Sequence, residues 1–171
     1  MCGWSKLGHR CLVVTVTFDF NGAGAGKPIT LSVNHSVAVA SNVAVPGFKL
    51  WTVGQGNLFT LQVTDTTTND ALLVRSGIRI VSTNTTSGRL LINGEPVKLL
   101  GVNRHTMWPD TGAAVTVEQE KSDVQLLQQL NANYVRGAHY PQSQSFLDMC
   151  DEAGIAIWYR RDYSTDLLLF L

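Results

Sequence analysis

The sequence is short of charge and has no long apolar run. Charged residues make up 15% of its 171 positions, and 13 basic side chains balance 13 acidic ones. Because the charges cancel, no global field draws the chain to nucleic acid or to a membrane surface. No apolar stretch approaches the ~18 residues that a membrane helix needs. We therefore expect neither nucleic acid nor a membrane as a partner, whereas a neutral sugar is compatible with this balance.

Cysteine is scarce and scattered. The three cysteines are Cys2, Cys11 and Cys150, and no C-x-x-C spacing occurs. An odd, dispersed set argues against a disulfide scaffold and against a zinc ribbon. A bridge between Cys2 and Cys11 stays an open alternative, and buried free thiols are the expectation.

Motifs for nucleotide binding and for serine nucleophiles are missing. The glycine-rich run at 22–26 is followed by Lys27-Pro28. A phosphate loop would lead into a helix, so this run is interpreted as a turn. No G-x-S-x-G elbow occurs either. We therefore expect no cofactor.

The first half of the chain, rich in Val, Thr, Ser and Gly, shows the alternation of half-buried strands. In the stretch 12–20, apolar residues alternate with mostly polar ones at a strict period of two, which is typical of a strand and not of a signal peptide. Similar patterns predict further strands, separated by turn-forming residues, at 37–45, 59–64 and 71–81. Several short strands with such punctuation predict an antiparallel β-sandwich over residues 1–87.

A different texture begins near residue 88. Two apolar runs, 89–92 and 97–100, flank Asn93-Gly94, which is a strong signal for a two-residue β-hairpin. Thr116 and Gln119 then fit a capping box at the start of a helix. The sequence therefore predicts a hairpin, whose second strand is 97–100, followed by a helix.

The remaining elements continue this order. A short strand at 133–136, a helix from about Ser143 to Gly154, and a buried strand at 155–158 follow one another. The order strand, helix, strand, helix, strand predicts parallel strands joined by crossover helices. We therefore expect a second, α/β domain over residues 88–171.

Polar side chains come at the ends of these parallel strands, where α/β folds place their sites. They lie in the segments 101–105, 136–141 and 159–162. Neutral imidazole both donates and accepts, and arginine offers a planar fork for hydroxyls or a carboxylate. His105 and His139 therefore favour a polar pocket, with the alternative that they only cap strand ends left open. A metal is not expected, because these histidines lack a well-placed third ligand.

Two tryptophans have different interpretations. Trp108 follows the first of these strands and either stacks on a sugar ring or packs against the sandwich. Trp51 is predicted to belong to the core of the sandwich half.

Residues from about 48 to 158 resemble, continuously and in order, the beta-galactosidase and beta-glucuronidase family, glycoside hydrolase family two. The segment 91–105 is similar to the family's junction between sandwich and barrel. The segments 130–141 and 147–155 resemble its next strand, helix and strand. The resemblance implies a multi-domain β plus α/β fold, in which an immunoglobulin-like β-sandwich (1–87) precedes the first βα units of an incomplete TIM barrel (88–171).

The resemblance also implies a function. Members of this family are retaining glycosidases that hydrolyse a β-glycoside with two glutamates, which lie on later barrel strands. We therefore expect no catalytic residue in this chain, and a truncated chain that does not hydrolyse glycosides alone. Its expected partner is a carbohydrate, a β-galactoside or similar. The substrate-binding residues implied are Asn103, Arg104, His105, Arg136 and His139.

The sequence departs from the family pattern in informative places. Thr106-Met107-Trp108 replaces an acidic residue and two histidines that beta-galactosidases often carry, and Ala138 replaces a serine. These differences weaken the assignment to galactosides specifically. The alternative function is a non-catalytic, carbohydrate- or protein-binding sandwich with an incomplete α/β appendage.

Overall fold

The computed structural model describes residues 13–20, 27–33, 37–41, 43–45 and 47–159. The chain divides into two compact units, and each takes residues from two stretches of the sequence. Unit 1 holds the described residues up to Phe48 together with Phe59–Ser76, and unit 2 holds Lys49–Leu58 together with the residues from Gly77 on. The domain boundary expected near residue 88 stays a prediction.

Several expectations of the sequence fall outside the described residues. They concern Cys2, Cys11, the glycine-rich run at 22–26 and the strand-end residues 160–162. Within the part that the structure describes, no helix is long and apolar enough to cross a bilayer.

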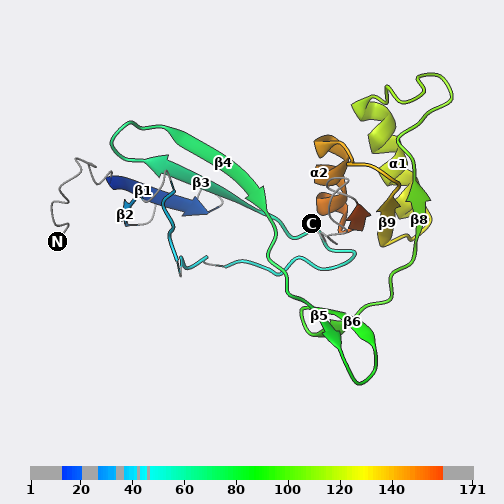
Figure 1. Ribbon diagram of the computed structural model, residues 1–171, viewed down its shortest axis with the longest axis horizontal. Helices are drawn as coiled ribbons and strands as arrows, with labels where there is room; N and C mark the ends of the chain where they lie inside the picture. The colour runs from blue at the N-terminus through cyan, green and yellow to red at the C-terminus, as the bar shows by residue number, and fades with distance from the viewer. Residues whose placement is uncertain (1–12, 21–26, 34–36, 42, 46, 160–171) are drawn as a thin grey trace, which may run out of the picture. The chain divides into compact units, whose positions relative to one another are not determined.

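Unit 1 is a four-stranded antiparallel sheet with the strand order β2-β1-β3-β4 (Figure 1). Its strands are β1 (Val13–Phe20), β2 (Ile29–Ser32), β3 (Phe59–Asp65) and β4 (Ala71–Ser76). The strands predicted at 12–20 and 59–64 are confirmed, and β4 fills the first part of the run at 71–81. The strand predicted at 37–45 is wrong for its described residues, which form no strand. β2 was not predicted, because its four residues show no clear alternation of apolar and polar side chains.

A sandwich needs a second sheet packed against the first. The described residues of unit 1 form one sheet, and on β4 the side chains of Leu72 and Leu73 are 63% and 67% exposed. Because neighbouring side chains of a strand point to opposite faces, both faces of the sheet are open at β4. The expected immunoglobulin-like sandwich is therefore not confirmed.

Unit 2 begins, after the Lys49–Leu58 segment, with three short antiparallel strands. They are β5 (Val81–Asn84), β6 (Arg89–Ile92) and β7 (Glu95–Pro96), in the sheet order β5-β6-β7. Asn93 and Gly94 have φ angles of 55° and 84°, the two positive values that a type I′ hairpin turn requires. The predicted hairpin is confirmed, but its second strand starts directly after the turn and is only two residues long.

A three-stranded parallel sheet follows, in the order β10-β9-β8. Its strands are β8 (Gly101–Arg104), β9 (Tyr134–Gly137) and β10 (Ala156–Tyr159). The strands expected at 133–136 and 155–158 are confirmed within one residue. The assignment of 97–100 as a strand is wrong, because β8 starts at Gly101. Instead, the Asn133 side chain accepts from the Leu100 N–H and donates to the Lys98 carbonyl at 2.7 and 2.9 Å.

Two helices cover one face of this sheet (Figure 1). They connect its parallel strands in the order β8-α1-β9-α2-β10, which confirms the predicted crossover helices. In α1 (Val117–Gln129), Thr116 and Gln119 form the expected capping box, and in α2 (Gln144–Ala153) Ser143 is the N-cap and Gly154, with φ of 69°, ends the helix. The helix-side core is the cluster of buried residues between sheet and helices: Val124, Leu127, Val135, Phe146, Leu147, Cys150, Ile155 and Ile157.

Among the described residues, a hydrophobic cluster covers the opposite face of the sheet where its strands begin. There Trp51 and Ile92, both 1% exposed, pack with Ala156 and Tyr134. Trp51 is buried as expected, but it belongs to unit 2 and not to the sheet of unit 1. Its indole N–H donates to the Asp151 carbonyl at 2.8 Å, so it also satisfies a backbone group at the end of α2.

Candidate functional site

Three side chains form one row across the parallel sheet, which we call the site row. Asn103 on β8 is paired in register with Arg136 on β9, and Arg136 with Trp158 on β10. Side chains alternate between faces along a strand, and Val135 and Ile157 lie in the helix-side core. The site row therefore lies on the face turned away from the helices. Asn103 is exposed, Arg136 is half-buried and Trp158 is 45% exposed.

Two histidines lie just beyond this row, in the loops that follow β8 and β9. The ring centroids of His105 and His139 are 5.4 Å apart with an interplanar angle of 78°. The Tyr140 ring lies 6.4 Å from that of His105, and its hydroxyl accepts from the Thr106 N–H at 2.8 Å. Both histidine side chains are exposed. The two loops thus bring two imidazoles and a phenol together at the carboxyl ends of the strands.

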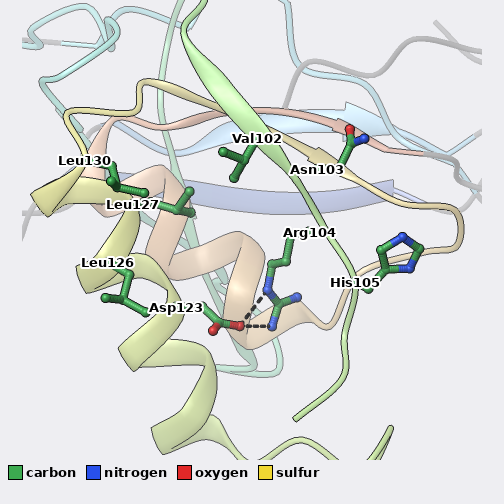
Figure 2. Close-up of a pocket in the computed structure, with 8 residues that line it drawn as sticks. All are labelled: Val102, Asn103, Arg104, His105, Asp123, Leu126, Leu127 and Leu130. Carbon is green, nitrogen blue, oxygen red and sulfur yellow. Dashed lines mark hydrogen bonds and ion pairs between the residues drawn. The ribbon is translucent and has the colours of Figure 1, made fainter. Parts of the chain in front are cut away.

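Arg104 points to the other side of the sheet, where Figure 2 shows it reaching toward Asp123 on α1 while Asn103 is directed away from that helix. It is 7% exposed. Its Nε donates to Asp123 Oδ2 at 2.8 Å, and Nη2 lies 2.8 Å from the same oxygen as an ion pair without a hydrogen bond.

Two further contacts complete the surroundings of Arg104. Nη1 donates to Gln142 Oε1 at 2.7 Å, and the guanidinium carbon lies 3.8 Å from the centre of the Phe146 ring. Among the five residues predicted to bind substrate, the structure therefore brings Asn103 beside Arg136 and His105 beside His139. Arg104 is committed to contacts on the helix side.

Carboxylates of α1 are held on the helix side as well. Asp123 pairs with Arg104, and Glu120, 3% exposed, accepts hydrogen bonds from the hydroxyls of Ser143 and Ser145. These contacts connect α1 to the start of α2. Within the described residues, no three metal-ligating side chains come together. The geometry thus offers hydrogen-bonding groups for a ligand, and the carboxylates of α1 serve the packing of the helices.

Burial shifts two pKa values near the site. It raises the pKa of Tyr134, which is on the same face as Arg136, and the Arg136 charge partly opposes that rise. It also raises the pKa of the Cys150 thiol to about 12. Cys150 is fully buried in α2, so it is a packing residue and not a nucleophile.

A pocket lies beside the free edge of β8 and the loop that follows this strand. Among the described residues β9 is the one strand paired with β8, and the pocket, of about 250 Å³, lies between β8 and α1. Val102, Leu126 and Leu130 line it and are 46%, 53% and 68% exposed (Figure 2). Trp108, in the same loop, is partly buried and pairs with Gly112 through a β-bridge.

Sequence reasoning missed two residues of this region. Trp158 was expected to be buried in its strand, but alternation places it in the site row. Gln142 gave no signal, because one glutamine in a loop has no pattern. It is 7% exposed and accepts from Arg104.

A family model matches residues 83–165 of the chain; it describes the TIM barrel domain of glycosyl hydrolases family 2. Among curated relatives, a beta-galactosidase of Actinobacillus pleuropneumoniae is 38% identical over 113 residues, which are 66% of this chain and 11% of that protein. A beta-galactosidase of Thermoanaerobacter pseudethanolicus is 43% identical over 90 residues, which are 52% of this chain and 12% of that protein. The chain thus spans little more than a tenth of the length of these relatives.

Solved structures of related glycosidases are also similar to this chain. A GH2 beta-galacturonidase from Eisenbergiella tayi superposes with a TM-score of 0.74 at 25% identity, over 86% of this chain and 26% of the other. Bifidobacterium dentium beta-glucuronidase, complexed with coumarin-3-O-glucuronide, superposes with a TM-score of 0.74 at 27% identity, over 86% of this chain and 24% of the other.

Proposed function

Because the chain belongs to glycosyl hydrolase family 2, we propose that Asn103, His105, Arg136 and His139 form part of the sugar-binding pocket of a retaining β-glycosidase. The observation that carries this proposal is the gathering of these groups at one edge. The rings of His105 and His139 are 5.4 Å apart, and Asn103 is the register neighbour of Arg136.

The chemistry of these groups suits a sugar. Imidazole nitrogens and the Asn103 amide offer both donors and acceptors to ring hydroxyls, and Arg136 offers a fork of donors. Trp158, partly exposed in the same row, presents an aromatic surface to the apolar face of a sugar ring. Hydrogen bonds from such groups accelerate hydrolysis where they strengthen as the sugar approaches the oxocarbenium-like transition state.

This chain is proposed to hold the sugar and not to cleave it. A retaining glycosidase places two carboxyl groups ~5–5.5 Å apart on either side of the scissile bond. The α1 carboxylates Glu120 and Asp123 are occupied by serine hydroxyls and by Arg104. β8, β9 and β10 themselves contain no aspartate or glutamate, so the proposal assigns the catalytic pair to other barrel strands.

The role of Arg104 differs from that of its neighbours. Its guanidinium contacts Asp123, Gln142 and Phe146 on the helix side, so it supports the pocket without touching the sugar.

The domain proposal keeps an immunoglobulin-like sandwich over 1–87 and the start of the TIM barrel over 88–171. The substrate proposal is a β-galactoside or a closely related β-glycoside, in line with the names of the curated relatives.

The test is an NMR titration of the isotope-labelled 171-residue chain. Methyl β-D-galactopyranoside and methyl β-D-glucuronide are added in parallel, and sorbitol serves as an acyclic control. We expect saturable shifts of the His105 and His139 ring signals, with a Kd on the order of millimolar. The substitution His139→Gln should weaken binding, whereas Met107→Gln, at a side chain 65% exposed in the neighbouring loop, should not.

Turnover is measured on the same sample. Nitrophenyl β-galactoside should release no nitrophenol above the rate without protein. Specific turnover would contradict the division between binding and catalysis, and ring signals that respond to sorbitol as they do to the glycosides would contradict the pocket itself.

A further inference from the structure

Two hydrogen bonds join the loops that carry His105 and His139. The Ala138 N–H donates to the Arg104 carbonyl at 2.9 Å, and the Thr106 N–H donates to the Tyr140 hydroxyl at 2.8 Å. The first contact continues the pairing of β8 and β9 into the loops, and the second ties the tip of one loop to the other. The separation of the two imidazoles therefore depends on how these loops are held.

Gln142 adds three further hydrogen bonds, two to the end of β8 and the loop after it and one within its own loop. Its Oε1 accepts from Arg104 Nη1 at 2.7 Å and from the Thr106 hydroxyl at 3.3 Å. Its Nε2 donates to the Tyr140 carbonyl at 3.1 Å. One buried amide thus binds both the end of β8 and the loop after β9.

The backbone around Gln142 leaves its side chain little freedom. A Cβ atom at Gly137 would lie 2.7 Å from Cγ of Gln142, so the glycine makes the room that the amide occupies. Arg104 is fixed in turn by Asp123 and by the Phe146 ring, at 2.8 and 3.8 Å. A buried amide whose oxygen accepts two hydrogen bonds and whose nitrogen donates one, in a confined rotamer, holds one geometry.

We propose that Gln142, held by Arg104, is a positioning residue that sets the distance between His105 and His139 for sugar binding. Gln142 does not touch the sugar. It acts through the two loops, because its hydrogen bonds go to Arg104, Thr106 and Tyr140. The link to sugar binding rests on the function proposed above, whereas the control of the histidine pair stands without it.

The experiment compares Gln142→Met with the matched control Gln144→Met. Both changes replace a hydrogen-bonded glutamine by a side chain of similar length, but Gln144 is exposed and donates to Asp148 within α2 at 2.8 Å. The measurement is the nuclear Overhauser contact between the His105 and His139 rings in the full chain, without ligand. The second measurement is the affinity for methyl β-D-galactopyranoside.

Gln142→Met should abolish the contact between the rings and weaken the sugar affinity roughly tenfold. Gln144→Met should change neither. If Gln142→Met does not fold, Thr106→Val removes the hydroxyl that bridges Arg104 and Gln142 while keeping the Thr106 N–H. It should loosen the same contact to a smaller extent.

The two proposals fail in different ways. A ring contact of unchanged intensity in Gln142→Met, or in Thr106→Val where that variant replaces it, overturns the positioning role, whatever the sugar does. A parent chain that takes no sugar, together with a ring contact that Gln142→Met removes, overturns the proposed function and supports the positioning role.

Discussion

The two faces of the parallel sheet in unit 2 make opposite use of the same strands. The helix side closes over an apolar core around Phe146, which is 0% exposed. The other face is sealed by Trp51 where the strands begin and carries Asn103, Arg136 and Trp158 where they end. The comparison teaches that one strand supplies stability and a binding surface from alternate residues. A side chain's contribution is therefore set by its face and not by its place in a motif.

The largest effect is expected from removing the centre of the helix side. Phe146→Ala should lower the free energy of unfolding of unit 2 by about 3–5 kcal/mol, because a buried ring is lost and a cavity is left. Trp158→Ala, on the opposite face, should cost about 1 kcal/mol, since 45% of that side chain is already exposed. Urea denaturation followed by tryptophan fluorescence measures both changes. Equal losses would show that the two faces are packed alike.

The two arginines give the second comparison. Arg104→Met should cost about 2–3 kcal/mol, because Asp123 loses the partner of a largely buried ion pair. Arg136→Met should cost less than about 1 kcal/mol, since the side chain is only half-buried. Arg136→Met should nevertheless abolish the response to methyl β-D-galactopyranoside. Unfolding curves and the sugar titration are recorded on the same preparations. A larger loss of stability in Arg136→Met than in Arg104→Met would contradict the assignment of Arg104 to the helix side and of Arg136 to the site face.

Local chemistry in the sequence predicted much of unit 2. Thr116 with Gln119, Ser143 and Gly154 marked the helix ends, and Asn93-Gly94 marked the hairpin. Each of these signals depends on a few neighbouring residues. That is why they could be interpreted without knowledge of the tertiary structure.

Long-range contacts decided what the sequence could not predict. The apolar run 97–100 has the composition of a strand, but the Asn133 side chain binds its backbone and β8 begins four residues later than expected. Trp51 lies far along the chain from Asp151, and nothing local announces their hydrogen bond.

The candidate site was partly predicted for a similar reason. Asn103, Arg104 and His105 are consecutive, and the resemblance assigned them one role. On a strand, however, neighbouring side chains point to opposite faces, so Arg104 could not share the face of Asn103. The pairing of Asn103 with Arg136 followed from the parallel order of strands, which the sequence did predict.

The segment that covers the site face where the strands begin should show a smaller effect than the arginine pair. Trp51→Phe keeps an aromatic ring but removes the indole N–H that binds the Asp151 carbonyl, and should cost about 1–2 kcal/mol. Trp108→Phe, in the partly buried loop after β8, should stay within about 0.5 kcal/mol of the parent chain. Thermal unfolding monitored by circular dichroism distinguishes them. A neutral Trp51→Phe would mean that the Lys49–Leu58 segment does not stabilise the end of α2.

The smallest expected effect is electrostatic and confined to the site face. Burial raises the pKa of Tyr134 while the Arg136 charge lowers it, so Arg136→Met should move that pKa further upward. Arg104→Met, on the other face, should leave the pKa of Tyr134 where it is. A tyrosine whose pKa is raised by folding stabilises the folded protein in its protonated form. This stabilisation is fully present below the unfolded pKa near 10 and is lost as pH rises through the folded pKa. Arg136→Met should therefore delay the ionisation of Tyr134 on the alkaline side. Titration of ring-labelled tyrosine by NMR measures the pKa of Tyr134 in each variant. A pKa that changes in Arg104→Met and not in Arg136→Met would contradict the electrostatic separation of the two faces.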